Sequence, residues 1–227
     1  MPRTRLQATV HNEEVVKRAL SADRLRTYER AVDSTGRRST PLELYLWNAR
    51  VSAAFLVPLH IGEVVVRNAV SDALTRMHGP RWPWVHGFRD SLPSPASGYN
   101  PRRELQRVAL RWKTDAADVI PALSFVFWQK IFTQRFDARL WSHCMASVLP
   151  GADASTPWHV TRAQIHDDLE QIRRLRNRIA HHEPIFARAL ADDVDAIRRV
   201  VERRCVPTAE WMSGHEAVTQ LLLDRPV

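Results

Sequence analysis

Residues 161–184, TRAQIHDDLEQIRRLRNRIAHHEP, carry five aliphatic side chains at intervals of three or four residues: Ile165, Leu169, Ile172, Leu175 and Ile179. This spacing matches the α-helical period, so the five side chains form one apolar stripe along a helix. We expect Thr161 to cap its start. The helix should end at about residue 182, because the residue before Pro184 avoids the helical conformation. The stretch therefore predicts a long amphipathic helix with one face in the core.

Outward from this stretch, the chain reads as helix after helix. Seven glycines and no sustained alternation of β-branched and aromatic residues argue against a large sheet. Helices are expected over about 11–33, 41–57, 59–77, 102–118, 119–149 and 188–205, with a short one after residue 207. Thr40 should cap the second of these, with Pro41 at its first position and a break or kink at Pro58. The predicted fold class is all-α, a helical bundle.

Two further segments shape this prediction. Residues 79–101 are rich in proline and glycine and are expected to form a long loop, and residues 33–36 a polar turn. The aromatic residues between 125 and 141 favour a core position over a base-stacking platform. They are Phe125, Phe127, Trp128, Phe132, Phe136 and Trp141.

The length of 227 residues predicts a single domain over 1–227, with an N-terminal helical extension at 1–39 and a C-terminal tail at 206–227. Two cysteines are too few for a disulfide scaffold. The first residues are not followed by an apolar signal segment. The longest apolar run, 51–59, is far shorter than the ~20 residues of a membrane span. We expect a cytoplasmic protein with no membrane partner.

The charge of the chain points to polyanionic partners. There are 33 basic and 25 acidic residues, a net charge of +8, and 30 of the basic residues are arginine. The planar guanidinium suits phosphate better than an ammonium does, so contact with nucleic acid is one expectation. An arginine-rich composition can equally reflect a GC-rich genome.

The densest polar cluster lies at the end of the predicted helix. Arg176 falls within the apolar stripe, so its guanidinium must meet a carboxylate, line a cleft or face a second subunit. Asn177 and His181 share another face, and His182 lies beside the stripe. A helix C-terminus favours the imidazolium form, which suits an acid–base group. On the residues alone, a pair of C-capping histidines without a catalytic role stays an open alternative. Arg173 and its neighbour at 174 are interpreted as ordinary surface charge.

A second cluster lies on the predicted helix 59–77, which is apolar almost all round. It contains Glu63, Arg67 and Asn68. A Glu63–Arg67 pair within the helix is one interpretation. The other is that Glu63 reaches Arg176 and orients it.

Several other chemistries lack their motifs. His181 and the two residues after it are consecutive and cannot all converge on one ion, and there is no C-x-x-C or H-E-x-x-H, so no metal site is expected. No glycine-rich phosphate loop and no G-x-S-x-G elbow occur. No helix-turn-helix with a basic second helix is evident. We expect no cofactor.

The run 175–184, LRNRIAHHEP, resembles the hallmark of the Abi-like (abortive infection) proteins, a branch of the HEPN superfamily of all-helical ribonucleases. The resemblance extends to Glu63, Arg67 and Asn68, to Gly79-x2-Trp82, and to the segment 123–132, and covers about residues 40–190. Arg176 and His181 match the R-x(4–6)-H signature, with Asn177 as its polar residue. His182 fits the longer spacing, so the resemblance leaves open which histidine acts.

The resemblance implies metal-independent RNA cleavage to a 2′,3′-cyclic phosphate, with two motifs facing each other across a homodimer. It also implies a role in abortive infection or toxin–antitoxin phage defence, with an antitoxin protein as a possible partner. Arg176 would stabilise the transition state, His181 would act as acid–base group, and Asn177 and His182 would position the phosphate. The alternative is a non-catalytic helical module that binds RNA or a partner protein.

Overall fold

The computed structural model describes residues 5–35, 39–112 and 115–226. About 76% of the chain is helical, and the described residues form no β-strand, which confirms the predicted all-α class. Residues 1–4 and Gly36, the last residue of the expected turn at 33–36, lie outside these ranges. The described chain divides into two compact units. The first unit holds described residues of 1–56, 178–191 and 217–227, and the second holds those of 57–177 and 192–216.

The first unit contains four complete helices: α1 (Arg5–Leu20), α2 (Ala22–Thr35), α3 (Pro41–Ala54) and α13 (Val218–Leu223). The single helix expected over 11–33 is wrong, because the chain breaks at Ser21. This residue has a φ of 70°, in the left-handed region that an α-helix cannot include. Its hydroxyl accepts a hydrogen bond from the backbone N–H of Arg24, which starts the next helix.

Helix α3 begins as the sequence predicts. Thr40 and Glu43 form a reciprocal capping box with distances of 3.2 and 2.7 Å, and Pro41 is the first helical residue. The helix ends at Ala54, whose carbonyl would have to accept from the missing N–H of Pro58. The indole Nε1 of Trp47 donates to the carbonyl of Leu221 at 2.8 Å, which fixes α13 against α3.

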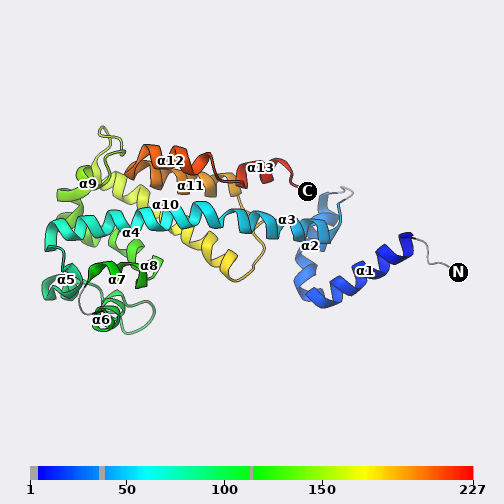
Figure 1. Ribbon diagram of the computed structural model, residues 1–227, viewed down its shortest axis with the longest axis horizontal. Helices are drawn as coiled ribbons and strands as arrows, with labels where there is room; N and C mark the ends of the chain where they lie inside the picture. The colour runs from blue at the N-terminus through cyan, green and yellow to red at the C-terminus, as the bar shows by residue number, and fades with distance from the viewer. Residues whose placement is uncertain (1–4, 36–38, 113–114, 227) are drawn as a thin grey trace. The chain divides into compact units, whose positions relative to one another are not determined.

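The second unit is built on three long helices, α4, α10 and α11. Figure 1 shows the short helices α5 to α8 near the end of α4. Its elements are α4 (Leu56–His78), η1 (Trp82–Trp84), α5 (His86–Ser91), α6 (Pro101–Arg111), α7 (Ala116–Ala122), α8 (Phe125–Ile131), η2 (Gln134–Phe136), η3 (Asp137–Trp141), α9 (Ser142–Val148), α10 (Trp158–Ala180), α11 (Leu190–Arg204) and α12 (Val206–Ser213). The first residue of α4, the last three of α10 and the first two of α11 are counted with the first unit.

Several predicted boundaries are therefore wrong. The expected loop 79–101 includes η1 and α5, and its longest stretch outside a helix is 92–100. The expected helices 102–118 and 119–149 are each divided into shorter ones. Thr161 does not cap α10, which starts at Trp158. The carbonyl of Pro157 already accepts from the N–H groups of residues 160 and 161, and Thr161 is buried inside the first turns.

The predicted core is confirmed. The five stripe residues of α10 are all buried, from Ile165 to Ile179, and so are the six aromatic residues between 125 and 141. Asp168 joins α10 to α11 through Arg199 and Arg203 at 2.6 and 2.7 Å. A Cβ added at Gly62 of α4 would lie 3.1 Å from a methyl group of Ile197, so α4 also packs closely on α11.

One stretch among the described residues, Pro41–His78, is long and apolar enough to cross a membrane by length and composition, because it contains an 18-residue window with a mean hydropathy of 1.5. A third of that window is buried in the fold, and core helices of soluble proteins pass the same test. The stretch is thus weak evidence for a membrane span.

Candidate functional site: the end of α10 and two cavities

Helix α10 ends in a Schellman motif built around His182. The N–H of His182 donates to the carbonyl of Ile179 at 3.0 Å, and the N–H of Glu183 donates to that of Arg178 at 2.8 Å. His182 has a φ of 54°, the left-handed conformation that this motif requires and that glycine usually provides. The helix therefore ends at the histidines, as the proline two residues later predicts.

The residues of this motif belong to the first unit. Arg178 and Glu183 are joined by an ion pair of 3.4 Å across the motif. His181 is exposed. His182 is also exposed, and its backbone carbonyl accepts a hydrogen bond from the guanidinium of Arg24 on α2. His182 therefore caps the helix through its backbone. The side chains of both histidines take no part in the cap and are accessible to solvent.

Arg176 lies in the second unit, and its Nε is 3.4 Å from Oε2 of Glu63 on α4. This contact confirms the predicted pairing between the two helices. Among the described residues, the alternative Glu63–Arg67 ion pair does not form. The Arg176 side chain is 46% exposed and lines a cavity of about 600 Å³, so the expectation that it borders a cleft is confirmed.

The cavity collects more cations than the sequence suggested. Asn177 lines it beside Arg176, and Arg173 and Arg107 add two further guanidinium groups from α10 and α6. Arg173 is therefore part of a concave site, which corrects its interpretation as plain surface charge. Within the described parts of the chain, Arg107 has no carboxylate at ion-pair distance, so its charge is available to an anion.

Carboxylates around this cavity hold its walls in place. Glu170 accepts from Arg173 at 2.7 and 3.0 Å, from Gln129 of α8 at 2.7 Å and from Arg174 at 2.8 Å. The hydrogen bond from Arg173, with those from Gln129 and Arg174, holds the pKa of Glu170 well below its usual range. The Arg173 guanidinium is therefore fixed by a partner that is ionised at neutral pH.

Glu104, which also lines the cavity, plays a similar part on α6. Its carboxylate accepts from the backbone N–H of Ser124 at 2.8 Å and from the Ser124 hydroxyl at 3.0 Å. It also accepts from the hydroxyl of Tyr99. These contacts fix α6 to the start of α8, and thereby fix the position of Arg107 at the cavity rim.

Four of the predicted site residues do not line this cavity: His181, His182, Arg67 and Asn68. Asn68 is exposed on α4. Arg67 is half-buried, and its buried Nε has no hydrogen-bond partner among the described residues. Both remain candidate supporting residues without an observed contact to the cavity.

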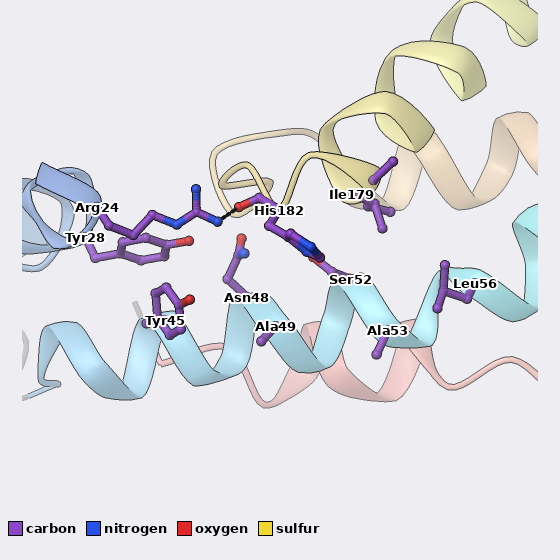
Figure 2. Close-up of a pocket in the computed structure, with 11 residues that line it drawn as sticks. Arg24, Tyr28, Tyr45, Asn48, Ala49, Ser52, Ala53, Leu56, Ile179 and His182 are labelled. Atoms are coloured by element: carbon purple, nitrogen blue, oxygen red, sulfur yellow. Dashed lines mark hydrogen bonds between the residues drawn. The ribbon is translucent and has the colours of Figure 1, made fainter. Parts of the chain in front are cut away.

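A second cavity, of about 400 Å³, lies within the first unit, between α2, α3 and the end of α10 (Figure 2). His182 lines it, together with Arg24 and Tyr28 of α2 and Asn48 and Ser52 of α3. Burial raises the pKa of Tyr28 to about 12, so its hydroxyl stays protonated at neutral pH.

Neither histidine belongs to a metal centre in the described structure. Among the described residues, no group of three or more His, Cys, Asp or Glu side chains is arranged to hold a metal ion.

Sequence reasoning missed Arg107 and the α2–α3 cavity. Nothing in the local sequence separates Arg107 from the other arginines of its helix. Asn48 did carry a signal, because it lies beside Trp47 and one turn from Leu44 and Val51 on a core-facing stripe. A polar residue on such a stripe must be hydrogen-bonded, and here Oδ1 of Asn48 accepts from the N–H groups of residues 185 and 186.

Comparison of the chain with protein-family models, with curated proteins and with solved structures finds no match.

Proposed function

We propose that this protein is an RNA-cleaving enzyme of the HEPN type, as its resemblance to the Abi-like proteins implies. The observation that supports this most is the placement of Arg176. Glu63 holds this guanidinium at 3.4 Å on the wall of a cavity that two more arginines and Asn177 line. Such a wall suits a phosphodiester, because each guanidinium offers several N–H donors to the phosphate oxygens.

The proposed reaction needs only the RNA and the side chains. The 2′-hydroxyl loses its proton to a base and its oxygen attacks the adjacent phosphorus. The bond from phosphorus to the 5′-oxygen then breaks, and an acid protonates the leaving oxygen. His181 is the proposed acid–base group, since imidazole titrates near neutral pH. Arg176 stabilises the charge that accumulates on the non-bridging oxygens. Asn177 and His182 are proposed to position the phosphate.

One histidine cannot easily serve as both base and acid in the same step. We therefore propose a homodimer in which each protomer supplies one motif. The proposed setting is the cytoplasm, in phage defence of the abortive-infection or toxin–antitoxin kind, where an antitoxin protein would silence the enzyme.

The test is cleavage of a synthetic RNA oligonucleotide in the presence of EDTA. We expect a 2′,3′-cyclic phosphate and a 5′-hydroxyl, and no cleavage of the DNA oligonucleotide of the same sequence, which lacks the 2′-hydroxyl. Arg176→Ala and His181→Ala should each lower the rate by about 10²–10³-fold. Arg103→Ala is the matched control, because Arg103 is exposed on α6 and does not line the cavity. His182→Ala shows which histidine acts.

Equal cleavage by wild type and by a folded His181→Ala variant, with His182→Ala also active, would sink the proposal. If wild type binds RNA in a salt-dependent manner without cleaving it, the protein is instead a non-catalytic RNA-binding module.

A further inference from the structure

The cavity of the first unit has two chemically different ends (Figure 2). At one end, Figure 2 shows Arg24, the Tyr28 hydroxyl, Asn48 and His182 gathered together; we call this the polar end. At the other end lie only aliphatic side chains, which we call the apolar end: Ala53, Leu56 and Ile179. A ligand that fills this cavity must therefore itself have a polar and an apolar part.

The polar end is built to receive negative charge. The hydrogen bond from Arg24 to the carbonyl of His182 orients the guanidinium and engages one of its nitrogens. A guanidinium has five N–H donors, so others remain for a ligand. The His182 ring points from the left-handed backbone toward Ser52 across the cavity (Figure 2).

Neutral donors complete the polar end. Asn48 uses its Oδ1 to accept the N–H groups of Ile185 and Phe186 at 2.8 and 3.1 Å. This fixes the orientation of its amide, so the NH₂ group is the part left to donate. The ring of Tyr28 is held by Tyr45 and Phe186, each with its centroid 5.2 Å away, and its hydroxyl points toward Asn48. These donors are therefore in place before a ligand arrives.

The size of the cavity limits the ligand to a small molecule or one unit of a polymer. Its volume of about 400 Å³ lies within the range of roughly 300–1,000 Å³ that is typical of small-molecule sites. A nucleotide has the required polarity, because its phosphate is anionic and its base is flat and largely apolar on its faces.

We propose that this cavity binds one nucleotide, with the phosphate at the polar end and the base at the apolar end. The choice of a nucleotide among organic anions rests on the proposed function, but the binding itself requires no cleavage. The nucleotide is either a free mononucleotide or one residue of an RNA chain.

The test is calorimetric titration of the full chain with adenosine 5′-monophosphate, adenosine and inorganic phosphate. We expect the mononucleotide to bind at least tenfold more tightly than either fragment, since only it occupies both ends. Arg24→Gln should weaken binding at least tenfold. Arg30→Gln is the matched control, because Arg30 is exposed on the same helix and does not line the cavity. Ala53→Phe should also weaken binding at least tenfold by filling the apolar end without removing any polar group.

A competition experiment, in which a 2′-O-methyl RNA oligonucleotide is added to the complex with the mononucleotide, distinguishes a site for a free nucleotide from a site for one residue of RNA. Displacement of the mononucleotide shows that the cavity accepts a residue of RNA, and no displacement shows a site for the free nucleotide. The inference is overturned if the mononucleotide does not bind, if it binds no better than its fragments, or if folded Arg24→Gln and Ala53→Phe variants bind like wild type. A mononucleotide has no internucleotide bond to cleave, so this result is independent of the cleavage assay.

Discussion

His182 adopts a backbone conformation that an L-residue enters at a cost of roughly 1–2 kcal/mol. Glycine would avoid this cost at the same position of the Schellman motif. The chain nevertheless carries an imidazole there, on the wall of a cavity. Strain at a residue that borders a cavity is a pattern often associated with function. In this conformation the ring points toward Ser52 (Figure 2).

We predict that His182→Gly is more stable than His182→Ala by about 1 kcal/mol in urea unfolding. Both variants lack the ring, so the difference isolates the cost of a Cβ at positive φ. An alanine variant as stable as the glycine variant would show that the helix end relaxes away from the left-handed conformation. His182→Gly is also the cleaner variant for the functional assays, because it removes the imidazole while preserving the helix end.

At the scale of elements, one close approach fixes the segment between α9 and α10 against α11. The N–H of Gly151 donates to the carbonyl of Arg203 at 2.9 Å. A Cβ at this position would lie 2.2 Å from the carbonyl oxygen of Glu202, and that atom belongs to helix backbone and cannot move aside.

Gly151→Ala should therefore destabilise the fold by about 1–3 kcal/mol, the usual cost of overpacking. Gly87→Ala is the matched control. A Cβ at Gly87 meets nothing within 4 Å, and alanine is a better helix former, so a small gain of about 0.5–1 kcal/mol is expected in α5. The measurement is the midpoint and slope of urea unfolding. A Gly151→Ala variant as stable as wild type would mean that the 151 segment is displaced from α11 in solution.

How far the sequence predicts these elements depends on what determines each one. The core face of α10 was predictable, because Ile165 to Ile179 keep one helical period and burial follows the period. The start of α3 was predictable, because the Thr40 cap acts through neighbouring residues. The break at Ser21 was not, since serine rarely adopts a positive φ and no local signal marks it.

The candidate site was predictable only in part, because several of its contacts join residues that are far apart in the sequence. The Glu63–Arg176 contact followed from two charged residues that each needed a partner, one on a helix that is apolar almost all round and one within the apolar stripe of an amphipathic helix. Arg107 reaches the cavity because Glu104 joins α6 to Ser124, a contact between segments 20 residues apart. The α2–α3 cavity depends on Asn48 and on residues more than 130 positions away. Tertiary contacts of this kind leave no periodic trace in the sequence.

At the scale of the whole molecule, the positive charge comes almost entirely from arginine, which supplies 30 of the 33 basic residues behind the net charge of +8. Much of this charge is already used within the fold. Asp168 forms ion pairs with both Arg199 and Arg203, and Glu170 forms one with Arg173. A guanidinium group that no carboxylate engages offers its full charge to RNA, and Arg107, which lines the cavity, is one of these within the described residues.

Each phosphate contact releases condensed counterions, so the affinity for single-stranded RNA should fall with salt by a log–log slope of roughly 0.7 per contact. We predict that Arg107→Ala weakens RNA binding and lowers this slope by somewhat less than one, about 0.7. Arg103→Ala removes the same charge from an exposed position of the same helix that does not line the cavity, and should leave the slope nearly unchanged. The measurement is fluorescence anisotropy of a labelled RNA over a series of salt concentrations, with His181→Ala as background in both variants to prevent cleavage. Equal slopes for the two variants would mean that RNA follows the overall charge of the surface and does not enter the arginine-lined cavity.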